Sequence, residues 1–82
     1  MIRVVLFASL REQLGTGATE VTDDVRCISD LVEALSRQHG KVWRVTLHSE
    51  NVRVAVNKSL VQGDHHIMDG DEVAFFPPVT GG

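Results

Sequence analysis

The residues with the clearest chemical potential close the sequence, in the stretch "FFPPVTGG" at residues 75–82. Pro77 and Pro78 fix their own φ angles and bias Phe76 toward extended geometry, so this segment should leave the domain as a stiff, projecting rod. Extended residues cover about 3.3 Å each, so residues 77–82 could reach roughly 20 Å beyond the domain. A stiff tail suits insertion into another protein, because less conformational freedom is lost on binding.

Gly81 and Gly82 would present a terminal carboxylate at the end of this tail. Without Cβ atoms, both residues can enter a narrow channel and let a nucleotide approach the backbone closely. A terminal carboxylate is anionic at neutral pH and therefore a poor electrophile. Activation by ATP to an acyl-adenylate would make its carbonyl carbon reactive, and a sulfur nucleophile could then replace the adenylate and leave a thiocarboxylate. The catalytic groups would belong to partner enzymes; an inert, frayed terminus is the alternative.

Size and composition limit what else the chain can do. It has 82 residues, of which 43% are hydrophobic and 23% charged, which predicts one small folded domain. Residues 1–76 would form its globular part and residues 77–82 a flexible C-terminal tail whose start the prolines stiffen. The basic residues are scattered between acids and the net charge is -3, so we expect no nucleic-acid partner. With a single cysteine and no apolar stretch of membrane-spanning length, we expect a cytoplasmic protein and no membrane association.

The first part of the chain predicts two strands with a short helical turn between them. In residues 2–7, "IRVVLF", alternate apolar side chains share one face, namely those of Ile2, Val4 and Leu6. Residues 9–14 change to helical spacing, with Ser9 and Glu12 placed as a capping box. Residues 19–21 suggest a second strand that returns beside the first.

The clearest helix is predicted over residues 28–39. Apolar side chains recur along it at the i, i+3, i+4, i+7 spacing of one buried stripe, at Ile28, Leu31, Val32 and Leu35. The next segment, "KVWRVTLH" at residues 41–48, is ambiguous. Its Val and Trp content favours a strand, while its position just past a helix allows an irregular turn.

Three further strands are predicted at residues 52–57, 59–61 and 72–76, separated by an Asn57-Lys58 turn and an Asp-Gly turn. The first and last strands of the chain are the most apolar, so they should be central and adjacent. This order of elements predicts an α+β domain of the β-grasp, or ubiquitin-like, type. Its mixed sheet of about five strands would carry one main helix packed across one face.

These stretches together closely resemble the MoaD family, the sulfur carriers that form the small subunits of molybdopterin synthase. The likeness runs nearly end to end, through "FASLREQLG", "VRVAVNKSLV" and "DGDEVAFFPPVTGG". The last stretch is the most specific, because a generic ubiquitin-like domain would share its Gly-Gly but not "FFPPVTGG".

The resemblance implies a sulfur-transfer role for the tail. An E1-like enzyme would use ATP to adenylate Gly82, and a sulfur donor protein would convert it to a thiocarboxylate, with no permanently bound cofactor and no metal. The small subunit, now carrying sulfur at its C-terminus, would then insert its tail into a large subunit. There its sulfur would go to a pterin precursor to build the dithiolene of molybdopterin. This chain would be the non-catalytic subunit of an assembly of two large and two small subunits, with the catalytic groups on the large one.

The resemblance also implies a docking surface on one side of the sheet. Phe7 falls on the face opposite Leu6, and Phe76 on the face opposite Phe75. Phe7 and Phe76 therefore form a candidate exposed apolar patch. Leu60 matches a further contact of the family. The start of the tail adds four candidate partner-binding residues, Pro77, Pro78, Val79 and Thr80. The alternative is that the two phenylalanines simply belong to the core of a small domain.

Other residues with chemical potential are assigned structural roles. Cys27 is expected to be a small buried packing residue. Relatives often place Thr there, and because Cys caps the main helix less well, it should cost about 1 kcal/mol of helix stability. His65 and His66 are adjacent and lack a third ligand nearby, so a solvated pair is expected. Trp43 is expected to cover the end of the helix. A local acidic cluster is either solvated or steers docking, and consists of Asp69, Asp71 and Glu72.

Competing functions would use the same tail differently. A sulfur carrier for thiamine or another thiolated product would carry sulfur on Gly82 in the same way. A ubiquitin-like modifier would instead join Gly82 to lysines of target proteins. An interaction domain with an inert tail would not use Gly82 at all.

Overall fold

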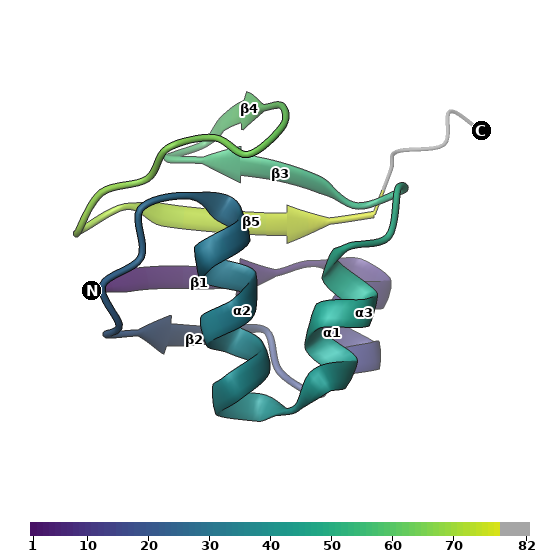
Figure 1. The fold of residues 1–82 in the computed structure, drawn as a ribbon. Coiled ribbons are helices and arrows are strands. Elements are labelled where there is room, and N and C mark those ends of the chain that lie inside the picture. Colours follow the sequence, from purple (N-terminus) through teal and green to yellow (C-terminus); the bar gives the residue numbers. More distant parts are fainter. Residues whose placement is uncertain (78–82) are drawn as a thin grey trace.

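The computed structural model describes residues 1–77, which form one five-stranded sheet with helices packed against it (Figure 1). The elements in chain order are β1 (Ile2–Leu6), α1 (Ala8–Leu14), β2 (Ala18–Val21), α2 (Ile28–His39), α3 (Lys41–Leu47), β3 (Arg53–Val56), β4 (Ser59–Val61) and β5 (Glu72–Phe76). The strand order is β2-β1-β5-β3-β4, with β1 and β5 parallel and the other neighbours antiparallel. The predicted mixed β-grasp sheet is confirmed, and its first and last strands are central neighbours.

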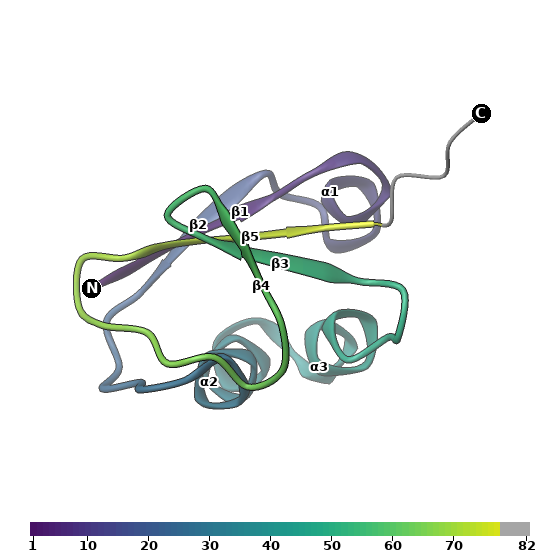
Figure 2. The same ribbon diagram turned by 90° about the horizontal axis from the view of Figure 1, so that it is seen from above.

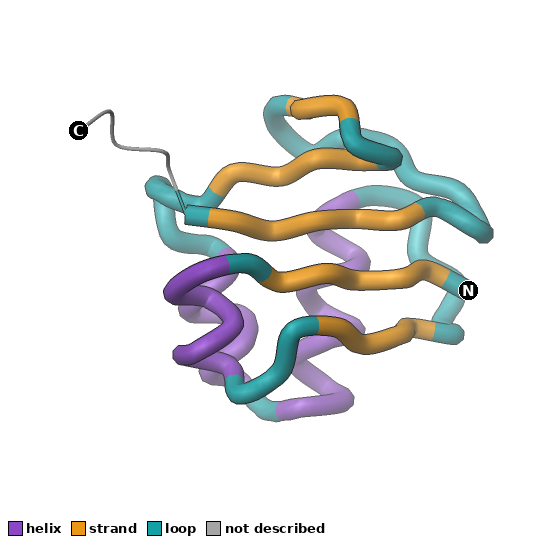
Figure 3. Tube along the Cα trace, turned by 180° about the vertical axis from the view of Figure 1, so that it is seen from behind, coloured by secondary structure: helices purple, strands orange, loops and turns teal. Residues whose placement is uncertain are grey.

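The helices are not distributed evenly around the sheet. Figure 2 shows α2 and α3 side by side along one face, which we call the inner face. The short helix α1 lies at the end of the sheet where β1 and β5 finish (Figures 1 and 3). The opposite surface of the sheet, the outer face, carries no helix over most of its area (Figure 3).

The core lies between the inner face and the two covering helices. In β1 and β5 the alternate residues predicted to share a face are almost completely buried, as Val4, Leu6, Val73 and Phe75 show. They pack against the predicted apolar stripe of α2, in which Leu31 and Leu35 are fully buried. Burial of this kind contributes roughly 1.5–3 kcal/mol for each large apolar side chain. The division between 1–76 and the tail from 77 stays a prediction.

The helical turn after β1 is confirmed, but its predicted capping box is wrong. The helix begins at Ala8, two residues earlier than the capping box requires, so Phe7 is the N-cap and no side chain caps α1. Ser9 therefore lies inside the first turn rather than at the cap. The buried side chain of Leu10 anchors the helix against the core. Packing thus holds the start of α1, while Gly15, with φ +77°, caps its end by donating its backbone N–H to the carbonyl of Arg11 at 3.0 Å.

Residues 41–48 do not form a strand or an irregular turn, as the sequence had suggested, because Lys41–Leu47 is the helix α3. Trp43 and Leu47 are four residues apart and both are buried, whereas Val42 and Val45 are exposed. A strand would have placed Trp43 and Val45 on the same side. The helical spacing of the two buried residues wins over the β-propensity of valine, since propensity is a weak preference that tertiary packing overrides.

A residue far away in sequence caps α2. Cys27 is the N-cap and gives no side-chain cap bond, as expected. The carboxylate of Asp64 accepts hydrogen bonds from the backbone N–H of Ser29 at 2.7 Å and from its hydroxyl, also at 2.7 Å. These bonds, the backbone one foremost, lower the pKa of Asp64. The loop that carries Asp64 therefore supplies the cap that Cys27 lacks.

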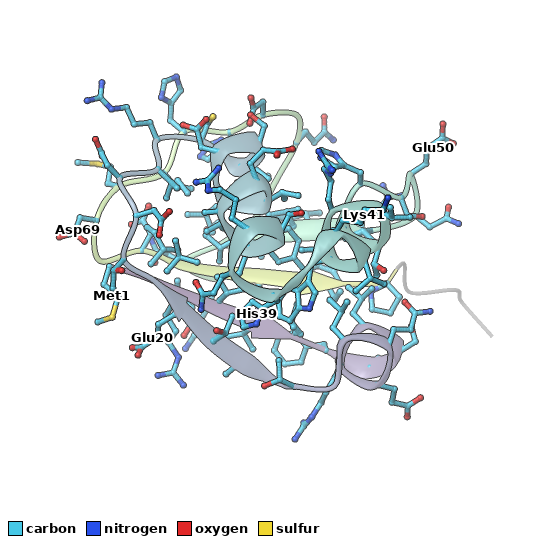
Figure 4. All side chains as sticks on the ribbon, turned by 60° about the horizontal axis from the view of Figure 1, so that its bottom comes forward. Met1, Glu20, His39, Lys41, Glu50 and Asp69 are labelled. Atoms are coloured by element: carbon cyan, nitrogen blue, oxygen red, sulfur yellow. The ribbon has the colours of Figure 1, made fainter. Side chains whose placement is uncertain are left out.

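A second carboxylate fastens the start of β5. Asp71 accepts hydrogen bonds from the side-chain amide of Asn57 at 3.0 Å and from the backbone N–H of Met68 at 2.8 Å, which lower its pKa. Asn57 and Lys58 both have positive φ, as the predicted two-residue turn between β3 and β4 requires. The N-terminal ammonium of Met1 pairs with Asp69, beside which it lies in Figure 4. These contacts tie the long loop before β5 to both neighbouring strands.

Candidate functional site: the outer face of the sheet

An apolar row crosses the whole outer face of the sheet. Strand alternation places Val5, Ala74 and Ala55 on this face, because their neighbours in sequence point into the core. The register aligns these residues with one another and with a residue on each edge strand, so that the row runs Ala18, Val5, Ala74, Ala55, Leu60. Leu60 is 65% exposed at the end of this row. The row is therefore apolar throughout, with Ala55 buried within it, Val5 and Ala74 partly exposed, and Leu60 open at its edge.

Two phenylalanines adjoin this row at the end of the sheet from which the tail departs. The backbone N–H of Phe7 donates to the carbonyl of Phe75 at 3.1 Å, which extends the β1–β5 pairing by one residue and keeps Phe7 next to Phe76. Phe7 is 49% exposed and Phe76 is half-buried, whereas Phe75 between the strands is fully buried. The predicted opposition of Phe75 and Phe76 is thus confirmed, and the two predicted patch residues do not belong to the core.

The other end of the outer face is charged. Arg3 on β1 lies between Glu20 on β2 and Glu72 on β5 in the register of the sheet. Its guanidinium is 3.6 Å from the carboxylate of Glu72. The outer face thus carries these paired charges at one end, and at the end where β5 finishes it carries Phe7 and Phe76, with the exposed Arg53 opposite Phe76. A partner that covers it would meet most apolar surface close to the tail.

The chain turns sharply just after Phe7. Ala8 has φ +53°, a left-handed conformation that residues other than glycine rarely adopt and that costs roughly 1 kcal/mol. This turn starts α1 directly beside the patch and lets Leu10 reach the core. The strain accompanies the outward exposure of Phe7.

A small hollow lies where the tail begins. It has a volume of about 320 Å³ and is lined by Leu10, Val52 and Pro77 together with polar residues of α1, of α3 and of the loop that follows α3. Pro77 is half-buried against this hollow. The last described residue is thus anchored between α1 and β3, beside the apolar patch. The predicted site residues Pro78, Val79, Thr80, Gly81 and Gly82 lie outside the described residues.

The structure brings together more of the site than the sequence analysis had named. Phe7 and Phe76 lie at one end of the outer face, and Leu60 lies on the same face two strands further along. Pro77 follows Phe76 and lines the hollow beside α1 and α3. Val5, Ala74 and Ala55, which connect the phenylalanines with Leu60, were missed. Alternation already placed them on the outer face, but only the strand pairing shows that they form one row.

The residues expected to be structural are mostly so. His65 and His66 are exposed, and no cluster of three potential metal ligands occurs within residues 1–77. Trp43 is buried and stacks on His39 at the end of α2, with ring centroids 4.2 Å apart. Cys27 is only half-buried, contrary to expectation, and its sulfur lies 3.3 Å from the hydroxyl oxygen of Ser29.

The acidic cluster is occupied by contacts within the molecule. Asp69 pairs with the N-terminus, Asp71 is bonded to Asn57, and Glu72 faces Arg3. These carboxylates thus have partners within the fold, a role that neither expected alternative, a solvated cluster or steering of docking, had included. No helix in the described part of the chain is long and apolar enough to cross a membrane.

Comparison with known proteins identifies relatives over the whole chain. Residues 4–82 match the model of the ThiS family. The chain is 48% identical to the molybdopterin synthase sulfur carrier subunit of Escherichia coli and 39% identical to that of Haemophilus influenzae, each over the full length of both chains. Its fold is similar to the crystal structure of SAMP1 from Haloferax volcanii, with a TM-score of 0.79 and 28% identity over 99% of this chain and 98% of that one.

Proposed function

Because the chain belongs to the ThiS family, we propose that it is the sulfur-carrier small subunit of a molybdopterin synthase. The observation that carries this proposal is the 48% identity, over the full length of both chains, to a molybdopterin synthase sulfur carrier subunit. The uncovered apolar outer face next to the tail supports it, since a carrier must dock before it delivers its cargo. The specific end of the sequence, "FFPPVTGG", supports it as well.

The chemistry begins at the carboxylate of Gly82. Attack of this carboxylate on the α-phosphorus of ATP forms an acyl-adenylate and releases pyrophosphate, in the active site of an E1-like enzyme. A persulfide or sulfide sulfur, supplied by a donor protein, then attacks the carbonyl carbon and AMP leaves. Attack by sulfide gives the thiocarboxylate directly. Attack by a persulfide gives an acyl disulfide, which a second thiol of the donor protein or of a thiol reductant cleaves, leaving the thiocarboxylate on the tail and a disulfide on the two thiol sulfurs. ATP and the covalent sulfur are thus transient, and the chain itself keeps no cofactor.

The thiocarboxylate is delivered to a large subunit. The outer face of the sheet, with Phe7, Phe76 and Leu60, docks on that subunit while residues 77–82 reach its active site. There the sulfur is transferred to a pterin precursor, and the dithiolene of molybdopterin forms. Groups on the large subunit catalyse this step, and two large and two small subunits make up the assembly. We place the reaction in the cytoplasm, where ATP is available and Cys27 stays reduced.

The proposal is tested by mass spectrometry of the protein after incubation with ATP, the activating enzyme and a sulfur source. We expect the mass of the C-terminal peptide to change by the exchange of one oxygen for sulfur. A variant that lacks Gly81 and Gly82 should fold normally and show no exchange. A terminus that stays a plain carboxylate under conditions that charge a known carrier would contradict the proposal.

The similarity to SAMP1, a small archaeal modifier protein, favours one second candidate function. In that case the activated Gly82 would be attacked by lysine amines of other proteins instead of by sulfur. Isopeptide-linked adducts in cell extracts, lost on deletion of Gly81 and Gly82, would support it. Complementation of strains that lack either molybdopterin or thiamine synthesis separates the proposed pathway from a carrier for thiamine.

A further inference from the structure

The arginines of this acidic protein differ in what they contact. Four of the six make ion pairs on the surface, with nitrogen–oxygen distances of 3.2–3.8 Å, namely Arg3 with Glu72, Arg26 with Asp24, Arg37 with Asp23 and Arg44 with Glu33. A fifth, Arg11, lies over Gly17, whose absent Cβ would fall 2.9 Å from the guanidinium Nε. Arg53 alone has neither kind of contact within residues 1–77.

Arg53 lies on the outer face, beside the apolar patch. It is the first residue of β3, it is exposed, and the register places it directly opposite Phe76. Val54, the next residue, packs against the core, so Arg53 projects to the opposite side. Arg53 and Leu60 also line one hollow of about 470 Å³ along β3 and β4. The cation thus stands between two of the residues to which we assign docking.

A partner that covers the patch also removes water from Arg53. A guanidinium that loses water without gaining an anion is costly, whereas a carboxylate can accept two parallel hydrogen bonds from its planar fork. Arginine is charged at every physiological pH, so the cost is not avoided by deprotonation. A complementary interface must therefore offer Arg53 an anionic group.

We propose that Arg53 is a specificity-determining residue of the docking surface, which selects a large subunit that presents an aspartate or glutamate side chain opposite it. This inference rests on the proposed function, since it assumes that the outer face docks on a large subunit. The arrangement joins an apolar anchor, Phe76, to one fixed charge in register with it. The charge rejects apolar or basic surfaces that the phenylalanines alone would accept.

The test is the binding of the cognate large subunit, measured as association and dissociation rates by surface plasmon resonance. Arg53→Glu is compared with Arg26→Glu, which changes the net charge equally but lies before α2, away from the outer face, on a side chain that is 81% exposed. We expect Arg53→Glu to weaken the complex at least about 10-fold, and Arg26→Glu less than about 2-fold. Arg53→Lys should be intermediate, because it keeps the charge and loses the two parallel bonds.

Three results would overturn the inference. Equal effects of Arg53→Glu and Arg26→Glu would show that only net charge matters. Loss of the Arg53 effect when the C-terminal carboxylate is replaced by an amide would show that its anion is the chain's own terminal carboxylate. An Arg53→Glu variant that binds normally while Leu60→Arg does not would leave the docking face intact and refute only the role of Arg53. If Leu60→Arg also binds normally, the docking face itself is wrong. Denaturation curves of each variant exclude misfolding as the cause.

Discussion

The two faces of the sheet are built from the same strands but meet different needs. On the inner face, Leu6 and Phe75 are fully buried beneath α2 and α3. On the outer face, the adjoining residues Phe7 and Phe76 are also large and apolar, but Phe7 is exposed and Phe76 is only half-buried. A sheet in a two-layer fold needs only one apolar face to fold, and antiparallel sheets usually keep the other polar. The apolar residues of the outer face are therefore not needed for the core, which leaves them available for the docking that we propose.

Truncating two adjacent phenylalanines, one on each face of the sheet, should give the largest difference between the two faces. Phe75→Ala removes a fully buried ring and should cost about 3–5 kcal/mol, which is most of the roughly 5 kcal/mol expected for so small a domain. Phe76→Ala should cost about 1 kcal/mol or less but weaken docking on the large subunit at least about 10-fold. Urea denaturation and isothermal titration calorimetry measure the two effects. Equal losses of stability would show that both rings belong to one core.

A charge placed on the outer face or on the exposed side of α3 tests which of these surfaces docks. Leu60→Arg and Val45→Arg alter side chains of similar exposure, 65% and 68%, on the outer face and on α3 respectively. The free energy of unfolding of both variants should lie within about 0.5 kcal/mol of the wild-type value, because both side chains are largely exposed. Leu60→Arg should weaken docking about 10- to 100-fold, and Val45→Arg should not change it. The contrary pattern in the binding assay would move the docking surface to the helices.

Acid should weaken the fold without altering the outer face. The folded-state pKa values of Asp64 and Asp71 are lowered by their hydrogen bonds, so the stability they contribute is present above the ordinary carboxyl range and is lost as the pH falls through the lowered values. Asp64→Asn and Asp71→Asn should therefore lower the Tm at pH 7 and flatten its decline in acid, while docking at pH 7 stays unchanged. Asp24→Asn is the control. If the Tm of the wild type and of all the variants falls equally steeply in acid, the hydrogen bonds of Asp64 and Asp71 contribute nothing to stability.

The smallest effect concerns the start of α2. Cys27→Thr would ordinarily stabilise a helix by about 1 kcal/mol, but Asp64 already accepts the N–H of Ser29. We expect a change of less than about 0.5 kcal/mol in unfolding free energy. The same substitution should stabilise more in an Asp64→Asn background. If Cys27→Thr gains the full amount in the wild type, the capping assigned to Asp64 is wrong.

Local patterns foretold much of this structure. The period-2 alternation of β1 and β5 predicts which residues are buried, and it also places Phe7 and Phe76 on the outer face. The apolar stripe of α2 is visible because it repeats over three turns. By contrast, α3 is short, and its valines favour a strand. Only the burial of both Trp43 and Leu47, four residues apart, identifies it as a helix. Its identity depends on tertiary contacts that the sequence does not display.

The rest of the site depends on contacts between distant segments. The row from Ala18 to Leu60 exists only once four strand pairings fix the register, and no single stretch of sequence contains that information. The cap from Asp64 on Ser29 spans 35 residues in the same way. That Arg53 has no ion pair with any other residue of the described range 1–77 also emerges only when the surrounding segments are placed. Patterns along the chain indicate faces, whereas the assembled sheet shows which side chains share them.

The most direct test of the central claim follows methyl groups by NMR while the large subunit is added to the labelled protein. Methyl groups of Leu60, Val5 and Ala74 report on the outer face, and those of Val42 and Val45 report on the exposed side of α3. If the outer face is the docking surface, the first group should shift or broaden and the second should not. Changes confined to the valines of α3, with the outer-face methyl groups unaffected in a saturated complex, would contradict the account.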